Sequence, residues 1–332
     1  MRKIINSPEN FVEDMLRGIY AAHPDLVKSV DGELRNFVSV RKKTGKVALS
    51  TGGGSGHLPL FLGYVGEGLL DGCSVGGVFQ SPSSTQMLEV TKDINQGAGV
   101  LYIYGNYTGD IMNFDMASEM AEMEGIEVRT VIGMDDVASA PKGEEFNRRG
   151  VAGIFFVYKC AGAAAEKMMN IDEVERIAKK ASDNVRTMGV ALSSCTIPRV
   201  GKPTFEVPDG EMAIGMGIHG EPGIRNSPIK SSDEIVNEIL EPILTDLEIK
   251  SGSEVSVLVN GLGATPKEEL YIMFSRVDAI LKERGIKIYR SYVGEFATSM
   301  EMAGASISIL RLDSELKEMI DAPAESPFFV QK

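Results

Sequence analysis

The chain has 332 residues, of which 43% are hydrophobic and 24% are charged, and both fractions are typical of a folded globular protein. These values exclude a disordered chain, a collagen-like repeat and a small disulfide scaffold. The formal net charge of -13 opposes binding to a phosphate backbone. The densest basic run, Arg41 to Lys43 followed by Lys46, is short and is predicted to be a solvated turn. The composition therefore argues against nucleic-acid binding.

Cysteine usage and the lack of long apolar runs predict a cytoplasmic protein that does not enter a membrane. Cys73, Cys160 and Cys195 are far apart and show no C-x-x-C spacing, which favours a reducing compartment and argues against structural zinc. We expect these cysteines to be buried small hydrophobic residues. The amino terminus lacks the apolar region of a signal peptide, and no apolar run approaches the roughly 20 residues that span a membrane.

Helix and strand patterns alternate along the first half of the chain, as in a parallel α/β sheet. Ser7 is predicted to cap a first helix and Pro8 to occupy its first position. The predicted strands are residues 46–50, 99–104 and 126–132, and each ends in a polar or glycine-rich segment. Before Gly125 we expect a helix in which methionines at mostly helical spacing pack in the core: Met112, Met116, Met120 and Met123.

The same alternation continues to the end of the chain. Residues 151–169 combine strand-like and helix-like composition and are predicted to form one buried helix, followed by a helix over 172–188 and a strand over 190–193. The remaining predicted helices are 235–247, 267–284 and 314–320, and the remaining strands are 255–259, 286–293 and 306–310. We expect two α/β domains with mainly parallel or mixed sheets, residues 1–188 and 189–332. The substrate site is expected at strand ends between them.

A glycine-rich segment, Gly52–His57, follows the first predicted strand and is predicted to be a loop. It lacks the lysine of a phosphate-binding P-loop and does not match the dinucleotide-binding pattern, so a nucleotide-phosphate site is a weak interpretation. The remaining interpretations are a close approach of the backbone to a ligand and a simple tight turn.

Titratable side chains near the predicted strand ends are the candidates for chemistry. Two of the three histidines, His57 and His219, lie in glycine-dense segments where a ligand could reach an imidazole, whereas His23 follows a helix and is expected to have a capping or surface role. Asp110 begins a helix, where helix capping is the simplest interpretation. The pair Asp135-Asp136 has no other metal ligands at fixed spacing, so a metal site is not expected there.

Longer motifs occur in a fixed order along essentially the whole chain. They are Gly52–His57, Gly63–Gly66, Phe79–Ser83, Asn106–Asp110, Gly189–Cys195, Gly215–Gly223 and Met300–Ser306. In this combination the chain resembles the dihydroxyacetone kinase family, and the match is to the substrate-binding K subunit of that family. Several long motifs in the right order make the resemblance highly specific.

The resemblance implies a two-domain α/β homodimer that binds a short ketose such as dihydroxyacetone and binds no nucleotide itself. His219 matches the histidine that attacks the substrate carbonyl and holds it as a covalent hemiaminal. His57 and Asp110 match residues beside the hydroxyl that is phosphorylated. These three residues are therefore the expected catalytic groups, and a neutral imidazole that adds to a ketone discriminates a ketose from glycerol.

The resemblance also implies the substrate contacts and the partner. The amides around Gly53 and Gly54, together with Ser81, are expected to bind substrate oxygens. The phosphoryl group is expected from a separate L subunit that carries ADP or ATP with magnesium. The nucleotide on that subunit is expected either to be recharged by phosphotransferase proteins or to be replaced by fresh ATP. No cofactor or metal is expected on this chain.

Three positions depart from the family pattern. Leu58 and Gly77 stand where the family usually has acidic residues, and Gly105 stands where it usually has lysine. Because acidic and basic groups are lost together, we infer that the losses compensate one another, since a buried charge left alone is costly. Glycine in place of lysine is also expected to open space for a longer ketose, such as erythrulose.

Two other functions remain open. Some relatives of the K subunit bind dihydroxyacetone through the same histidine and act as transcriptional coactivators, without phosphorylating it. A nucleotide-binding oxidoreductase is the weaker alternative, because the dinucleotide-binding pattern is absent. The discriminating property is the partner, because a kinase subunit must bind an L subunit and a sensor must bind a regulator.

Overall fold

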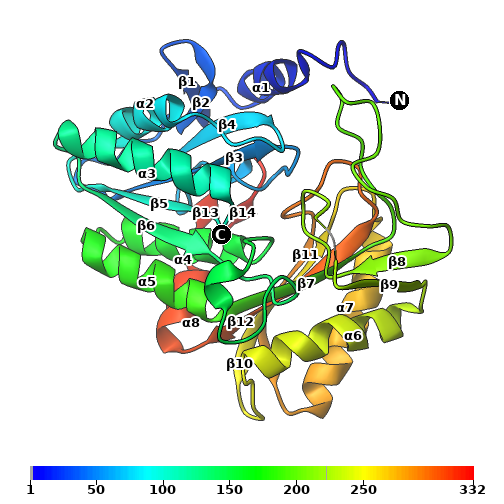
Figure 1. The fold of residues 1–332 in the computed structure, drawn as a ribbon. Coiled ribbons are helices and arrows are strands. Elements are labelled where there is room, and N and C mark those ends of the chain that lie inside the picture. The colour runs from blue at the N-terminus through cyan, green and yellow to red at the C-terminus, as the bar shows by residue number, and fades with distance from the viewer. Residues whose placement is uncertain (1–2, 222) are drawn as a thin grey trace.

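The computed structural model describes residues 3–221 and 223–332, so Met1, Arg2 and Pro222 of the Gly215–Gly223 motif lie outside it. The described residues form two six-stranded sheets and a short hairpin, with eight α-helices around them (Figure 1). Both sheets mix parallel and antiparallel strands, so the predicted α/β class with mixed sheets is confirmed.

The first sheet is built from the first 133 residues of the chain. Its strand order is β1 (Val27–Val30), β2 (Glu33–Ser39), β4 (Gly72–Val78), β3 (Ala48–Ser55), β5 (Val100–Gly105) and β6 (Val128–Gly133). Strands β4, β3, β5 and β6 are parallel, whereas β1 and β2 add an antiparallel edge. The successive strands β4 and β5 lie on opposite sides of β3, which makes the carboxyl ends of β3 and β5 a topological switch point.

The second sheet is mostly antiparallel. Its strand order is β11 (Lys287–Gly294), β10 (Glu254–Gly261), β12 (Gly304–Leu312), β7 (Val185–Ala191), β8 (Glu211–Ile214) and β9 (Arg225–Pro228), and only β10 and β11 pair in parallel. A hairpin of β13 (Ala324–Glu325) and β14 (Val330–Gln331) ends the chain. Short 3-10 helices cover Leu62–Tyr64 and Glu145–Asn147.

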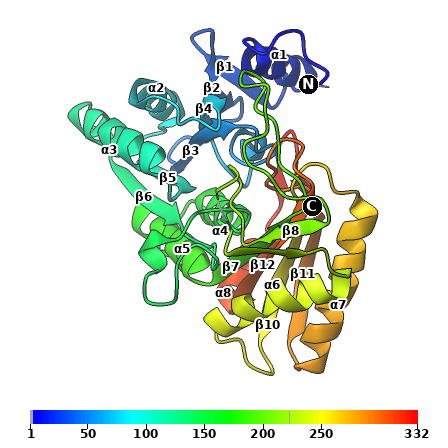
Figure 2. The same ribbon diagram turned by 45° about the vertical axis from the view of Figure 1, so that its right-hand side comes forward.

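Helices cover the sheets on several sides. They are α1 (Phe11–Ala22), α2 (Ser84–Ile94), α3 (Thr108–Met123), α4 (Ile154–Glu166), α5 (Ile171–Asp183), α6 (Ser232–Asp246), α7 (Lys267–Glu283) and α8 (Ser314–Asp321). Figure 1 shows α2 and α3 on one face of the first sheet and α4 and α5 on the other, with α6 and α7 against the second sheet. Figure 2 shows the connection from β7 to β8 rising towards α1, where Arg199 donates to the carbonyl of Glu9.

Helix α4 is buried from Ile154 to Ala165, which confirms the predicted buried helix. One apolar cluster joins this helix to Leu49 of the first sheet and to Leu258 and Leu310 of the second. A helix that is buried on all sides requires such cover on all sides. Helix α4 therefore forms the common core between the two sheets.

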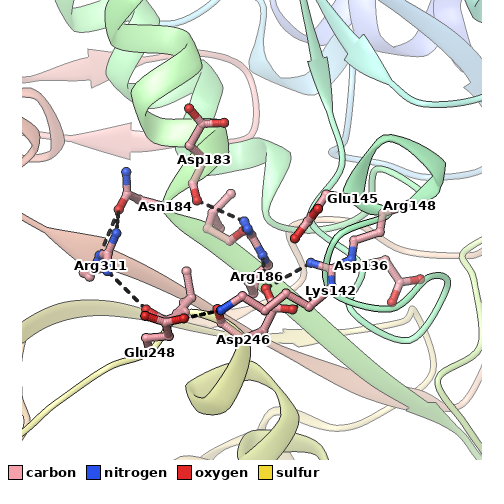
Figure 3. A network of polar contacts seen from close by, with 12 residues as sticks. Asp136, Lys142, Glu145, Arg148, Asp183, Asn184, Arg186, Asp246, Glu248 and Arg311 are labelled. Carbon is pink, nitrogen blue, oxygen red and sulfur yellow. Dashed lines mark hydrogen bonds and ion pairs between the residues drawn. The ribbon is translucent and has the colours of Figure 1, made fainter.

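The two sheets meet where the chain leaves β6. The amide of Val137 donates to the carbonyl of Thr187 (3.1 Å), and the amide of Thr187 donates to the carbonyl of Asp135 (2.7 Å). Nearby, the Arg148 guanidinium is only 1% exposed and donates to both carboxylate oxygens of Asp246 at the end of α6, at 3.0 and 2.6 Å (Figure 3). Backbone pairing and a buried ion pair thus hold the two halves together.

The division into domains at residue 188 stays a prediction. Strand β7 spans this position, so both sides of the proposed boundary belong to one strand of the second sheet. The hairpin after α8 returns to the first half, where the Ser326 hydroxyl donates to the carbonyl of Gly63 (2.8 Å).

Two predicted helix boundaries are wrong. Helix α1 begins at Phe11 rather than at Pro8, and Ser7 accepts a hydrogen bond from the amide of Asn10 (3.2 Å) instead of capping the helix. Helix α5 ends at Asp183 rather than at residue 188, because residues 185–191 pair with β12 as strand β7. Strand pairing with a distant segment overrides the local helical pattern there.

The glycine-rich segment is largely strand rather than loop. Strand β3 continues to Ser55, and Gly52 and Gly53 pair with Ser74 and Val75 of β4. The strand is longer than predicted because alignment with β4 supplies backbone partners that the glycine-rich composition does not reveal.

The prediction of a solvated basic turn is wrong for Lys46, which is buried. Its side chain is only 5% exposed and its ammonium lies 2.8 Å from carboxylate oxygens of both Asp71 and Glu166. Burial opposes the charge, but the two carboxylates raise the net pKa of Lys46. Asp71 also accepts the amide of Leu49 (2.8 Å), so this basic residue anchors the start of β3.

The prediction that the methionines of α3 pack in the core is wrong. Met112, Met116 and Met123 are 65%, 53% and 84% exposed, and Met120 is partly buried. The buried face of α3 is formed instead by Asp110, Phe114, Ala117 and Ala121. Helical spacing correctly placed the methionines on one face but did not reveal that another face packs on the sheet.

All three cysteines are buried free thiols, as predicted. Among the described residues, no helix combines the length and apolar character required to cross a bilayer.

Candidate functional site

The candidate site lies at the carboxyl ends of β3 and β5, at the switch point of the first sheet. His57 comes two residues after β3, and Asp110 lies in the first turn of α3, shortly after β5. His219 comes from the connection between β8 and β9 of the second sheet. The structure thus brings together candidates from both halves of the chain, at a position where open α/β sheets bind ligands.

Aromatic rings surround the two histidines. The ring centroids of His57 and His219 are 4.6 Å apart and their planes are perpendicular. Phe79 stacks on His57 at 4.8 Å, and Tyr107 meets the edge of His219 at 4.6 Å. These contacts fix both imidazoles, whereas His23 lies directly after α1 with its ring 6.2 Å from that of Phe328.

His57 has a defined tautomer. Its Nδ1 lies 2.8 Å from the carbonyl oxygen of Thr298, which can only accept, so Nδ1 carries the proton. Its Nε2 is buried without a hydrogen-bond partner and therefore presents a free lone pair. Burial and the nearby His219 lower the pKa of His57 to about 3, so this imidazole is neutral.

His219 is oriented by Glu221. Its Nδ1 lies 2.9 Å from one carboxylate oxygen of Glu221, and its backbone amide donates to the other at 2.9 Å. Burial opposes ionisation of Glu221, but its hydrogen bonds with His219 lower the pKa of this carboxyl to about 2. An ionised Glu221 is an acceptor for a proton on Nδ1, and with the proton on Nδ1 the Nε2 atom of His219 can present a lone pair as a nucleophile.

Sequence reasoning did not single out Glu221, Tyr107, Phe79 or Thr298. A carboxylate two residues from a histidine in the same glycine-rich motif was a usable signal for Glu221. The other three contacts arise from the tertiary arrangement, and Thr298 lies 241 positions from His57.

Asp110 does not cap its helix, contrary to the simplest interpretation of its position. The cap position is Tyr107, which has no side-chain cap hydrogen bond. The Asp110 side chain is buried, and its Oδ1 has no hydrogen-bond partner. Burial raises the pKa of Asp110 to about 6, although the Ser81 hydroxyl and the nearby His219 lower it in part. Ser81 therefore lies beside Asp110.

Close packing explains why positions 53 and 54 are glycines. A Cβ on Gly53 would lie 2.5 Å from the ring of Phe61, and one on Gly54 would lie 2.7 Å from the amide nitrogen of Gln80. Any other residue would have to displace these neighbours. The expected role of the two amides in binding substrate oxygens stays a prediction.

The three departures from the family pattern occupy different environments. Leu58 is half-buried in the apolar core, and its carbonyl accepts the Thr298 hydroxyl (2.8 Å). A Cβ on Gly77 would lie 2.6 Å from the flexible end of Gln80. Gly105 is buried, and a Cβ there would lie 3.1 Å from the ring of Tyr107. The Tyr107 ring therefore fills the position directly beside Gly105, where glycine was expected to open space.

Asp135 and Asp136 have structural partners. Asp135 accepts the amides of Val151 (2.9 Å) and Gly153 (2.8 Å), and Asp136 pairs with Arg149 (2.8 Å). Within residues 3–221 and 223–332, no three His, Cys, Asp or Glu side chains are placed to hold a metal ion.

The arrangement can perform addition to a carbonyl and proton transfer. The His219 imidazole, held by Glu221 through Nδ1, can offer Nε2 as a nucleophile, while His57 and Asp110 each present a buried polar atom without a partner. Unpartnered buried polar atoms are costly, so two of them in one site indicate a ligand that supplies hydrogen bonds.

Comparisons with known proteins show the family of the chain. Residues 17–328 match the model of the Dak1 domain, and the chain therefore belongs to the Dak1 family. It is 46% identical, over 99% of both chains, to the PTS-dependent dihydroxyacetone kinase 2, dihydroxyacetone-binding subunit DhaK of Listeria innocua. It is 42% identical to the L-erythrulose kinase of Pectobacterium atrosepticum, over 99% of this chain and 56% of the relative. Among solved structures, it resembles the dihydroxyacetone kinase operon co-activator Dha-DhaQ, with a TM-score of 0.90, 31% identity and coverage of 96% and 98%.

Proposed function

We propose that this chain is the substrate-binding subunit of a dihydroxyacetone kinase and holds a short ketose as a hemiaminal on His219. The observation that carries the proposal is the pairing of His219 with Glu221, which leaves the Nε2 lone pair of His219 free beside the unpartnered Nε2 of His57. The 46% identity to a dihydroxyacetone-binding subunit over the full length of both chains supports the same substrate class.

Addition of the ketose follows from the geometry around His219. The Nε2 lone pair attacks the carbonyl carbon, and the π electrons of the carbonyl move to its oxygen, which takes up a proton. The imidazole releases its Nδ1 proton towards Glu221, so one N–H and one C=O become one N–C bond and one O–H. Glycerol has no carbonyl, so the same step selects a ketose against it.

Two further groups act on the hydroxyl that receives the phosphoryl group. Asp110, with a pKa raised to about 6, is the better proton acceptor near neutral pH, whereas His57, with a pKa near 3, acts mainly as a hydrogen-bond acceptor. As the hydroxyl oxygen bonds to phosphorus and the donor's P–O bond breaks, Asp110 takes the hydroxyl proton. Phosphoryl transfer otherwise requires mainly orientation and charge neutralisation.

The phosphoryl donor belongs to the partner in this proposal. A separate L subunit carries ADP or ATP with magnesium, and this chain contributes the bound ketose. We also propose a homodimer in the cytoplasm, on the basis of the family resemblance and of the cysteine usage.

Two alternatives share the same site. The likeness to a co-activator of the dihydroxyacetone kinase operon favours a sensor, but the identity is 31% against 46% for the DhaK relative. The 42% identity to an L-erythrulose kinase favours a longer ketose, although this chain spans about half the length of that relative.

The deciding experiment is titration of the chain with dihydroxyacetone and erythrulose, followed by phosphate transfer from an added L subunit with ATP. We expect His219→Ala to abolish ketose binding and transfer, while His23→Ala, at the histidine directly after α1, keeps both. Binding that depends on His219 but supports no transfer to either ketose would instead establish the sensor. Binding that survives His219→Ala would overturn the covalent step.

A further inference from the structure

The connection that carries His219 is fixed to the first half of the chain by one buried arginine. Arg149, whose side chain is only 13% exposed, donates from Nη2 to the carbonyl of Gly215 (2.9 Å), the first residue after β8. Its Nε donates to the carboxylate of Asp136 (2.9 Å), just beyond β6 of the first sheet. One guanidinium thus joins the end of the first sheet to the start of the segment that ends at His219.

The same guanidinium lies close to the middle of the segment that carries His219. A Cβ built on Gly217 would lie 2.7 Å from Nη1 of Arg149 and 2.1 Å from Oε2 of Glu221. Both atoms therefore border the small space that glycine leaves at position 217. Glycine at this position thus lets the segment pack closely against Arg149.

We propose that Arg149 is a positioning residue for His219: it fixes the residue 215–221 segment against the first sheet. The inference rests on the proposed function, because it assigns a role towards the same nucleophile. Lysine carries the charge but cannot reproduce the planar fork that reaches two acceptors at once.

The contacts of His219 show what depends on the position of this segment. The His219 ring meets the rings of His57 and Tyr107, and its Nδ1 pairs with Glu221 of the same segment. Removing the Arg149 side chain removes the hydrogen bond that connects Gly215 to the guanidinium held by Asp136. We therefore expect His219 to be held less firmly beside His57 and Tyr107.

The neighbouring Arg148 is a matched control. It is also buried and also joins the two halves, but its guanidinium binds Asp246 at the end of α6, in the network of Figure 3 rather than at the site. Arg148→Met and Arg149→Met therefore both remove a buried cation from the junction, but only the second change reaches His219.

The experiment measures dihydroxyacetone affinity, and the kcat and KM of phosphate transfer, in the wild type, Arg149→Met, Arg149→Lys, Arg148→Met and Arg148→Lys, with melting temperatures in parallel. We expect Arg149→Met to weaken binding about tenfold or more and to raise KM by more than it lowers kcat. Arg149→Lys shows a smaller loss of affinity, and Arg148→Met lowers the melting temperature without weakening ketose binding.

Failure of this inference is separable from failure of the proposed function. If the wild type binds ketose through His219 but Arg149→Met retains its affinity and its KM, Arg149 is not a positioning residue. A variant that fails to fold is identified by its melting temperature. In that case the conservative variants Arg149→Lys and Arg148→Lys are compared instead, and an equal loss of ketose affinity in the two overturns the inference. If the wild type binds no ketose, the proposed function itself fails.

Discussion

The imidazole of His57 meets the imidazole of His219 edge to face, with ring centroids 4.6 Å apart and planes at 90°. Each ring uses Nδ1 for a fixed acceptor, the carbonyl of Thr298 in one case and the carboxylate of Glu221 in the other. The same tautomer therefore leaves Nε2 free on both rings. Two adjacent imidazoles arranged in this way can serve different roles, one as nucleophile and the other as hydrogen-bond acceptor for a substrate hydroxyl.

His57→Asn separates these two roles. Because Asn can still donate to the carbonyl of Thr298 but has no acceptor at the position of Nε2, we expect ketose affinity to change only a few-fold while phosphate transfer falls about 100-fold. Parallel titration and transfer assays measure the two quantities, with His23→Asn as the control. Equal losses of affinity and transfer would show that His57 serves binding alone.

Asp110→Asn tests the cost of a buried carboxylate. The folded-state pKa of about 6 lies above the ordinary value of 3.8, so the folded protein binds this proton more tightly and loses stability as pH rises between these values. Because Asn carries no charge, the Asp110→Asn variant does not lose this stability as pH rises. We expect Asp110→Asn to have no stabilising effect below about pH 4 and to stabilise the protein by up to about 3 kcal/mol above pH 6.

Urea unfolding across this pH range measures the effect of Asp110→Asn. The control is Asp115→Asn, an exposed position on the same helix, whose effect should be small at every pH. Phosphate transfer should fall about 100-fold or more with Asp110→Asn, because the proton acceptor is lost. A stabilisation that does not depend on pH would contradict the raised pKa.

Lys46→Met tests the buried ion pair at the start of β3. Removing the ammonium leaves Asp71 and Glu166 without their shared cation, so we expect a loss of about 3–5 kcal/mol in the free energy of unfolding. Lys43→Met, at an exposed lysine of the same basic run, should change it by less than about 0.5 kcal/mol. Chemical unfolding of both variants measures the two free energies of unfolding. Similar small losses in both variants would contradict a stabilising buried ion pair at Lys46.

Gly105→Lys tests whether the departures from the family pattern compensate one another. A side chain at this position must displace the Tyr107 ring, which also packs against His219. We therefore expect lower stability, by about 1–3 kcal/mol, and slower transfer to dihydroxyacetone. Gly105→Ala controls for the steric effect alone, and Gly105→Lys combined with Leu58→Glu should recover part of the activity. Faster transfer by Gly105→Lys alone would overturn the compensation.

The sequence by itself identified much of the fold and the three site residues now found in one region. Ordered motifs led to His57, Asp110 and His219, and alternating patterns located most of the helices and strands that frame them. This succeeded because strand ends and glycine-rich segments are local features, and in an α/β sheet the carboxyl ends of neighbouring strands converge.

The tertiary structure alone decided which faces are covered and which groups are paired. Helical spacing placed Met112 and Met116 on one face of α3, but only the packing of α3 on the sheet shows that this face is exposed. Likewise, Lys46 is a buried ion-pair partner rather than a solvated residue, because Asp71 and Glu166 come from distant segments. Periodicity defines the faces of an element, whereas burial and charge pairing depend on neighbours that the local sequence does not contain.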